Sequence, residues 1–198
     1  MRRNKALVIL SSPRKGSNSS MAALFLANLI DPGFDAVDIN RLSIRPCTAC
    51  DRCADTFKCV YKDDAPALIK KMKKATVVIV AAPVYFTGVP APMKAFIDRN
   101  QPEWQRRQCG TRNADCGMRS GVIILTQGAR KPRYFKPAES EIRAMFAVNG
   151  IKTVKVLKFR GMDEKTAIIK DRKSMSVLES MFTRLVQLPQ TKVCGYKI

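Results

Sequence analysis

Apolar runs rich in β-branched residues alternate with helix-like segments along most of this chain, and this alternation constrains its fold more than any other feature. The runs that we expect to form strands are residues 6–11, 34–40, 76–82, 121–127 and 151–159. Helical patterns cover residues 19–30, 63–74, 90–99, 137–148 and 173–187. Strands that alternate with helices predict a parallel sheet with helices on both faces.

The expected architecture is a doubly wound α/β fold with five strands in the flavodoxin-like order 2-1-3-4-5. Such sheets bind ligands at the carboxyl ends of the strands, where the strand order reverses between the first and third strands. The loops after Leu10 and Ala82 are therefore the first candidates for binding. With 198 residues, 46% of them hydrophobic, the chain is expected to form a single domain over residues 1–198. Residues 100–119 are interpreted as an inserted loop that acts as a lid or contact segment.

No apolar segment is long enough to suggest a membrane or a secretion signal. The run at residues 6–10 is too short for a signal-peptide core, and no segment has the length of a transmembrane helix. We therefore expect a soluble cytoplasmic protein without membrane contacts. Thiols are kept reduced in the cytoplasm, so clustered cysteines there are more often metal ligands or redox groups than disulfides.

The chain is strongly basic and contains no histidine. Its formal net charge is +20, which favours polyanionic ligands, nucleic acid or acidic protein partners. A nucleic-acid-binding module with a structural four-cysteine metal site is a remote alternative, because no recognised nucleic-acid motif accompanies the charge. The lack of histidine excludes Ser-His-Asp triads, histidine-assisted cysteine nucleophiles and metal sites that contain histidine.

The loops after the first and third expected strands have complementary chemistry. The first, "SSPRKGSNSS", matches neither the P-loop nor the G-x-G-x-x-G fingerprint, but it places hydroxyls, an Asn and an Arg before a helix. It suits a phosphate or an ordinary helix cap. In the other loop, "APVYFTGVPAPMKAFIDR", Tyr85 and Phe86 offer a flat apolar wall or contribute to the core. A ring slot beside a phosphate slot matches the two ends of FMN.

Four cysteines lie close together in residues 45–62. Cys47, Cys50, Cys53 and Cys59 have the spacing C-x2-C-x2-C-x5-C. This is close to the C-x2-C-x2-C-x3-C run of ferredoxins, whereas all-cysteine zinc sites usually consist of two separated C-x2-C pairs. A four-iron four-sulfur cluster is the leading interpretation, with zinc and metal-free cysteines as alternatives. The other cysteines, Cys109, Cys116 and Cys194, are expected to be free.

These motifs together resemble the iron-sulfur flavoproteins within the NADPH-dependent FMN reductase group of flavodoxin-like proteins. The two loops, the cysteine run followed by "KDD", and "GMDEK" after the fifth strand occur in the order typical of that group. The resemblance implies that the FMN phosphate is bound by Ser12, Arg14, Ser17, Asn18 and Ser19. It implies that the isoalloxazine ring is held by Pro83, Val84, Tyr85 and Phe86, with Thr126 and Gly128 on its other side. Ser11 and Ala49 stand where the family commonly has glycine, and the segment with Trp104 matches no family feature.

The expected function is electron transfer by an FMN-dependent oxidoreductase that couples the flavin to the cluster. No side chain needs to act as a catalytic group. Electrons would come from ferredoxin or NAD(P)H and pass to a small acceptor such as a quinone or an oxygen species. The basic surface fits an acidic carrier such as ferredoxin. The alternative is a cluster-free NAD(P)H-dependent FMN or quinone reductase.

Two further expectations concern where the cluster lies. The cysteine run follows the second strand, so we expect it at the same sheet edge as the FMN loops, within a few strand widths of about 4.8 Å. The resemblance also implies a homodimer or homotetramer in which cluster and flavin from different subunits approach each other.

Overall fold

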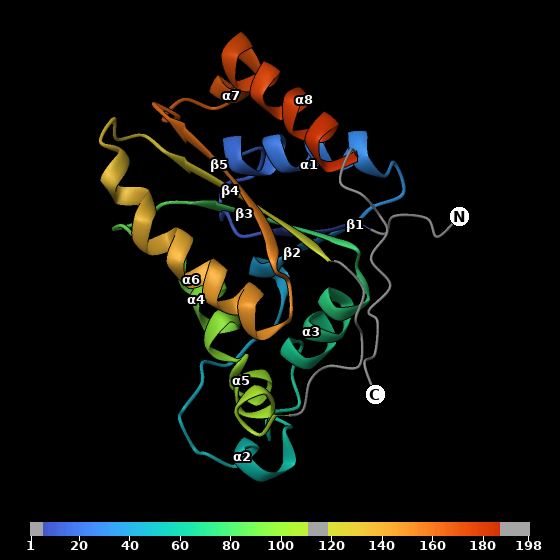
Figure 1. Ribbon diagram of the computed structural model, residues 1–198. Coiled ribbons are helices and arrows are strands. Elements are labelled where there is room, and N and C mark those ends of the chain that lie inside the picture. The colour runs from blue at the N-terminus through green and yellow to red at the C-terminus, as the bar shows by residue number, and fades with distance from the viewer. Residues whose placement is uncertain (1–5, 111–118, 187–198) are drawn as a thin grey trace.

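The computed structural model describes residues 6–110 and 119–186, which contain one five-stranded parallel sheet (Figure 1). Its strands are β1 (Ala6–Leu10), β2 (Asp35–Asp38), β3 (Val77–Pro83), β4 (Ser120–Gln127) and β5 (Thr153–Arg160). All neighbouring pairs are parallel, and the order is β2-β1-β3-β4-β5. The predicted fold class and strand order are therefore confirmed.

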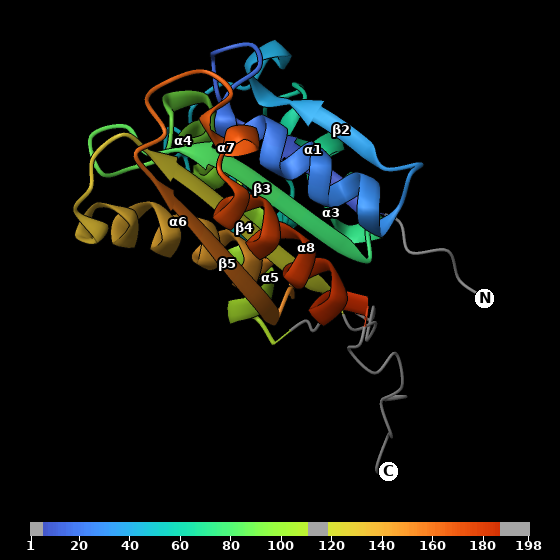
Figure 2. The ribbon, with the colours of Figure 1, turned by 90° about the horizontal axis from the view of Figure 1, so that it is seen from above.

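Helices cover both faces of the sheet. They are α1 (Asn18–Ile30), α2 (Cys53–Thr56), α3 (Ala65–Lys74), α4 (Ala91–Asp98), α5 (Gln101–Gln108), α6 (Phe135–Val148), α7 (Ala167–Lys170) and α8 (Arg172–Val186), with short 3-10 turns η1 (Ile39–Arg41) and η2 (Pro132–Tyr134). Helices α1, α7 and α8 lie on one face, and α3, α4 and α6 lie on the other (Figures 1 and 2). Among the described residues, no helix combines the length and apolar character needed to cross a bilayer.

Alternate side chains of the central strands form two separate cores. On β3, Val78 and Val80 pack with α3, α4 and α6, whereas Ile79 and Ala81 pack with α1 and α8. All four are fully buried, which explains why this strand is apolar without alternation.

Two elements differ from the sequence-based expectation. Residues 101–108, expected to be loop, form helix α5, although its polar sequence QPEWQRRQ buries only Pro102 and Glu103. Strand β2 ends at Asp38, because the Asp38 side chain accepts a hydrogen bond from the Asn40 backbone N–H and starts η1. The rest of the expected inserted loop at 111–118, with Cys116, lies outside the described residues, as do Gln187 and Cys194.

Candidate functional site

The loops after β1, β3 and β4 lie side by side at the carboxyl edge of the sheet (Figure 2). Both the backbone N–H and the hydroxyl of Ser11 donate to the Ala81 carbonyl, at 3.0 Å and 2.9 Å. The Val84 N–H donates to the Thr126 carbonyl at 2.8 Å. Ser11, which stands where the family commonly has glycine, thus ties two of the predicted loops together.

The loop between β1 and α1 brings hydroxyls to the N-terminus of a 13-residue helix. Ser17 caps that helix by accepting from the Ser20 N–H at 3.2 Å, and its hydroxyl lies 3.3 Å from that of Ser19. The Ser12 hydroxyl accepts from the Arg14 N–H at 3.2 Å. No acidic side chain occupies the first turn of α1. This set of hydroxyls, a guanidinium and helix N-terminal amides fits a phosphate group.

Asn18 has a different partner from the one predicted for it. Its side-chain amide donates to the Met162 and Glu164 carbonyls, at 3.1 Å and 2.8 Å. Its side-chain oxygen accepts from the Ile168 N–H at 3.0 Å. The side chain therefore fixes the segment after β5 against the start of α1.

The loop after β3 presents an exposed aromatic turn. Tyr85 and Gly88 exchange two backbone hydrogen bonds, at 2.9 Å and 3.0 Å. Phe86 and Thr87, at the turn, both have positive φ, 48° and 69°, as a type I′ turn requires. The Phe86 side chain is fully exposed, so the core-packing alternative is excluded for it. An exposed apolar side chain here fits the face of a ring system.

Two residues that the sequence did not indicate support these loops. The Asn40 amide donates to the Ser12 carbonyl at 3.0 Å, which links η1 to the phosphate loop. The Glu141 carboxylate on α6 accepts from the Val89 N–H at 3.3 Å, just after the aromatic turn. Neither residue lies in a recognisable motif, because each acts through contacts between segments distant in sequence.

Gly128 lies at a close approach between the loops after β4 and β5. A Cβ at this position would collide with the Asp163 carboxylate, so no larger residue fits without a shift. The Met162 N–H donates to the Gln127 carbonyl at 3.0 Å and joins the same two loops. Thr126, at the end of β4, is 5% exposed. The "GMDEK" segment thus borders the predicted ring slot.

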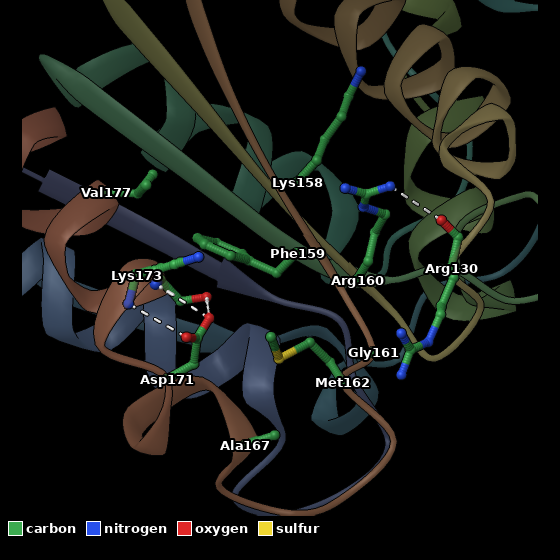
Figure 3. Close-up of a pocket in the computed structure, with 11 residues that line it drawn as sticks. Arg130, Lys158, Phe159, Arg160, Gly161, Met162, Ala167, Asp171, Lys173 and Val177 are labelled. Atoms are coloured by element: carbon green, nitrogen blue, oxygen red, sulfur yellow. Dashed lines mark hydrogen bonds between the residues drawn. The ribbon is translucent and has the colours of Figure 1, made fainter.

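A basic hollow of about 790 Å³ opens beyond β5 (Figure 3). Its lining includes four cations, Arg130, Lys158, Arg160 and Lys173. Arg160 donates to the Arg130 carbonyl at 3.2 Å, and Lys158 extends to the opposite side of β5 from Phe159 (Figure 3). Lys158 is paired with Glu139 at 2.6 Å, and Asp171 also lines the hollow. The remaining cations, Arg130, Arg160 and Lys173, leave an excess of positive charge that can attract a small anion or an acidic surface.

The four clustered cysteines line a second hollow, of about 170 Å³. Cys47, Cys50, Cys53 and Cys59 share it with residues from the end of α4 and the start of α5, namely Arg99, Gln101, Pro102 and Gln105. All five cysteines in the described part of the chain, including the exposed Cys109, are free thiols.

The cysteine hollow and the aromatic loop lie at opposite ends of helix α4. Helix α4 begins just after the aromatic loop and ends at the cysteine hollow, so its eight residues, about 12 Å, separate the two. Figure 1 shows α2 next to α5, on the side of α4 away from the sheet. Residues 42–64 form the connection that carries the thiols from the end of η1 to the far end of α4.

Burial and nearby charges shift the pKa values of two residues that line the cysteine hollow. Burial raises the pKa of the Cys53 thiol, and the charges of Cys59, Cys47 and Cys50 raise it further. Arg99 also lines the hollow and is 2% exposed. Burial lowers the pKa of Arg99, but its hydrogen bond to Asp63 and the charge of Cys59 outweigh this and raise it. The four thiols are therefore close enough to interact electrostatically, with one guanidinium beside them.

In residues 6–110 and 119–186, no three or more His, Cys, Asp or Glu side chains are grouped as the ligands of a metal ion. The donor set nevertheless fits a cluster, because four thiols around one hollow are the usual ligands of a four-iron four-sulfur cubane. A cubane has iron at four corners and so separates its thiolates more widely than one ion does. The buried Arg99 Nε, which has no hydrogen-bond partner among the described residues, also fits a sulfur-rich occupant.

The cysteine loop carries local backbone strain. Ala49, Asp51 and Phe57 have positive φ angles of 50°, 55° and 53°. L-residues rarely adopt this conformation, and strained positions of this kind cluster at ligand sites. The loop is therefore held in its shape by its surroundings rather than by local preference.

Comparison with known proteins agrees with this geometry. The family described as NADPH-dependent FMN reductase matches residues 4–130. An iron-sulfur flavoprotein of Archaeoglobus fulgidus is 38% identical over 131 residues, which are 65% of this chain and 57% of that protein. An iron-sulfur flavoprotein of Methanosarcina thermophila is 43% identical over 97 residues, 46% of this chain and 50% of that protein. The chain thus spans about half the length of these curated relatives.

The fold is also shared with solved structures. The NAD(P)H:quinone oxidoreductase from Methanothermobacter marburgensis superposes with a TM-score of 0.63 over 97% of this chain and 98% of that one. The sequence identity is 14%, so this likeness concerns the fold alone.

Proposed function

Because the chain belongs to the NADPH-dependent FMN reductase family, we propose that it is an FMN-dependent oxidoreductase that couples its flavin to a four-iron four-sulfur cluster. The observation that carries the cluster part of this proposal is the position of Cys47, Cys50, Cys53 and Cys59 around one hollow. Its relatives named iron-sulfur flavoproteins support the same assignment.

The flavin would bind across the three neighbouring loops at the carboxyl edge. Ser12, Arg14, Ser17, Ser19 and the backbone of Asn18 would hold the phosphate. The ring would lie against Pro83, Val84, Tyr85 and Phe86, with Thr126 and Gly128 on its other side. Because the backbone hydrogen bonds of β1, β3 and β4 fix these loops relative to one another, the site is organised by the sheet.

FMN exchanges electrons in pairs or singly and a cluster passes one at a time, so together the groups supply conversion between hydride-type and single-electron chemistry. The side chains bind and orient these groups, and no histidine is present to act as an acid or base. The four thiolates would hold the cluster, and the loop conformation around Ala49 would aim them inward.

The electron donor would be a reduced ferredoxin or NAD(P)H, and the acceptor a small molecule such as a quinone or an oxygen species. A net charge of +20 favours an acidic carrier protein. The basic hollow beyond β5 adjoins the loop after β4 and offers cations to the phosphates of a nucleotide donor.

A homodimer or homotetramer would bring the flavin of one subunit close to the cluster of another. Within one chain the length of α4 separates the cysteine hollow from the aromatic loop, so a flavin of a neighbouring subunit could approach the cluster more closely than the chain's own. Sedimentation of the purified protein tests this, and a monomer with full activity would contradict it.

The test of the proposed function is an anaerobic visible spectrum, with iron, sulfide and FMN measured per chain. We expect flavin bands over a broad iron-sulfur absorption and about four irons. Cys50→Ser should lose the iron and keep the FMN, whereas Cys109→Ser, which changes an exposed thiol outside the hollow, should keep both. A wild-type protein with FMN and no iron would refute the cluster.

The second candidate is a cluster-free NAD(P)H-dependent FMN or quinone reductase. It is favoured by the description of the family, NADPH-dependent FMN reductase, which names the flavin and the nucleotide donor but no cluster. Saturable NAD(P)H oxidation by protein that never acquires iron on anaerobic reconstitution would select it.

A further inference from the structure

Arg99, directly after α4, is held in one orientation by contacts on several sides. Its Nη1 donates to the Asp63 carboxylate at 2.5 Å and to the Arg45 carbonyl at 2.8 Å, and its Nη2 donates to Asp63 at 3.0 Å. The guanidinium carbon lies 5.1 Å from the centre of the Tyr61 ring. With only 1% of its side chain exposed, Arg99 has no solvent-facing alternative.

These three hydrogen bonds use three of the five N–H donors of the side chain, and Nε–H is not among them. Arg99 Nε is buried and makes no hydrogen bond to any described residue. A buried donor left unpaired is costly, so such an atom usually has a partner that belongs to the functional state. Arg99 lines the thiol hollow, and the charge of Cys59 acts on it. The hollow offers oxygen acceptors on side chains such as Asp51 and Gln105 as well as the four cysteine sulfurs, and of these sulfurs Cys59 is the one that interacts with Arg99.

We propose that Arg99 is a positioning residue for the cluster, whose Nε–H donates a hydrogen bond to the Cys59 thiolate and whose charge raises the reduction potential of the cluster. This inference rests on the proposed function, in which the four cysteines hold the cluster. Charge near a cluster and hydrogen bonds to its sulfurs are among the factors that set its potential.

The redox step on which Arg99 would act is the one-electron reduction of the cluster. One electron passes from an external one-electron carrier to the oxidised cluster, no bond to Arg99 breaks, and Arg99 neither gains nor loses a proton. Reduction would add one negative charge to the four-cysteine site, and the guanidinium would stabilise that added charge. The Asp63 carboxylate opposes this effect, because it is paired with the same guanidinium and carries the opposite charge.

The test compares midpoint potentials in anaerobic dithionite titrations of the FMN-loaded, cluster-loaded protein. Arg99→Gln should lower the ratio of reduced to oxidised cluster about tenfold at a fixed potential, a shift of about 59 mV for one electron. Arg99→Lys keeps the charge but lacks Nε–H, so its potential should fall between the two. Asp63→Asn should shift the potential in the opposite direction. Arg107→Gln, on the exposed part of α5, removes the same charge away from the hollow and should leave the potential unchanged.

The midpoint potential should fall in Arg99→Gln and rise in Asp63→Asn if the charges set the potential of the cluster. If the two residues only supported the structure, the potential would shift in the same direction in both variants. Equal potentials in the wild type and Arg99→Gln, with iron and FMN retained, would overturn the inference, as would a lowered potential in Asp63→Asn. If neither Arg99 variant retains the cluster, the Asp63→Asn variant decides: a raised midpoint potential supports the inference, and a lowered one overturns it. A wild type without iron instead refutes the proposed function.

Discussion

The Arg99 guanidinium and the Asp63 carboxylate form a buried ion pair that joins the end of α4 to the segment just before α3. Their side chains are 1% and 6% exposed. Asp63 also accepts from the Arg45 N–H at 3.0 Å and the Ala65 N–H at 3.2 Å. One carboxylate therefore fixes both ends of the cysteine-containing connection.

The first prediction follows from this pair. Asp63→Ala leaves the Arg99 charge buried without its partner and should lower the free energy of unfolding by about 3–5 kcal/mol. Urea denaturation followed by circular dichroism measures it. The control is Asp35→Ala, whose ion pair with Lys71 is about half exposed and should cost under about 1 kcal/mol. Equal losses in the two variants would contradict the prediction.

The second prediction concerns Ala49, which has a φ of 50° in the cysteine loop. Ala49→Gly removes a left-handed strain of about 1–2 kcal/mol but adds unfolded-state entropy worth about 0.5–1 kcal/mol. We expect a net gain in stability of about 0.5–1 kcal/mol in the same assay. Ala54→Gly, in the neighbouring helix α2, should destabilise instead, and a loss at Ala49 would show that the strain is absent.

The third prediction concerns Asn18, whose amide makes three hydrogen bonds to the segment after β5. Asn18→Ala leaves buried backbone groups unpaired and should lower stability by about 1–3 kcal/mol. It should also weaken FMN binding, measured by flavin fluorescence, because the "GMDEK" segment loses its attachment beside the ring slot. Asn28→Ala, on the exposed face of α1, is the matched control, and an unchanged FMN affinity in Asn18→Ala would exclude this link.

The fourth prediction is a pH dependence. Burial acts to raise the pKa of Glu139, but hydrogen bonds from Lys158 and Arg143 outweigh it, and the pKa is lowered. The stabilisation by Glu139 is therefore complete above the unfolded-state pKa of about 4.3 and is lost as the pH falls through the lower folded-state pKa. Glu139→Gln should lose less stability than the wild type between neutral pH and about pH 3. Urea midpoints measured across this pH range give the stability of both proteins. A wild type and a Glu139→Gln variant that lose stability equally as the pH falls would refute the prediction.

The fifth prediction tests the carrier. Reduction by an acidic ferredoxin should slow about tenfold or more between ~0.02 M and ~0.3 M salt, because salt screens the attraction to a basic surface. Stopped-flow rates measure it, with an uncharged one-electron reductant as the control. A rate that does not change with salt would count against a ferredoxin donor.

The sequence predicted β1, β3 and β4 well because each of these buried strands is a nearly continuous apolar run bounded by polar loops. Strand order followed from the resemblance and from the alternation of strands and helices. Helix α5 was missed because QPEWQRRQ has no apolar stripe to mark a helix. The spacing predicted the four cysteines as one set, but not the residues at the end of α4 that share their hollow, since a connection of this length can run in any direction. The role of Arg99 could not be predicted, because Asp63 and the thiols meet it only in three dimensions.

The position of β5 at the edge of the sheet has a consequence for the association of this chain with other molecules. An edge strand carries unpaired N–H and C=O groups, to which a strand of another molecule can add. On β5, Lys155 and Arg160 carry positive charge, whereas the charge of Lys158 is paired with Glu139, so a second copy of the same strand would bring like charges together. The basic character of the chain therefore also guards against aggregation, because it stops the sheet from growing beyond its fifth strand.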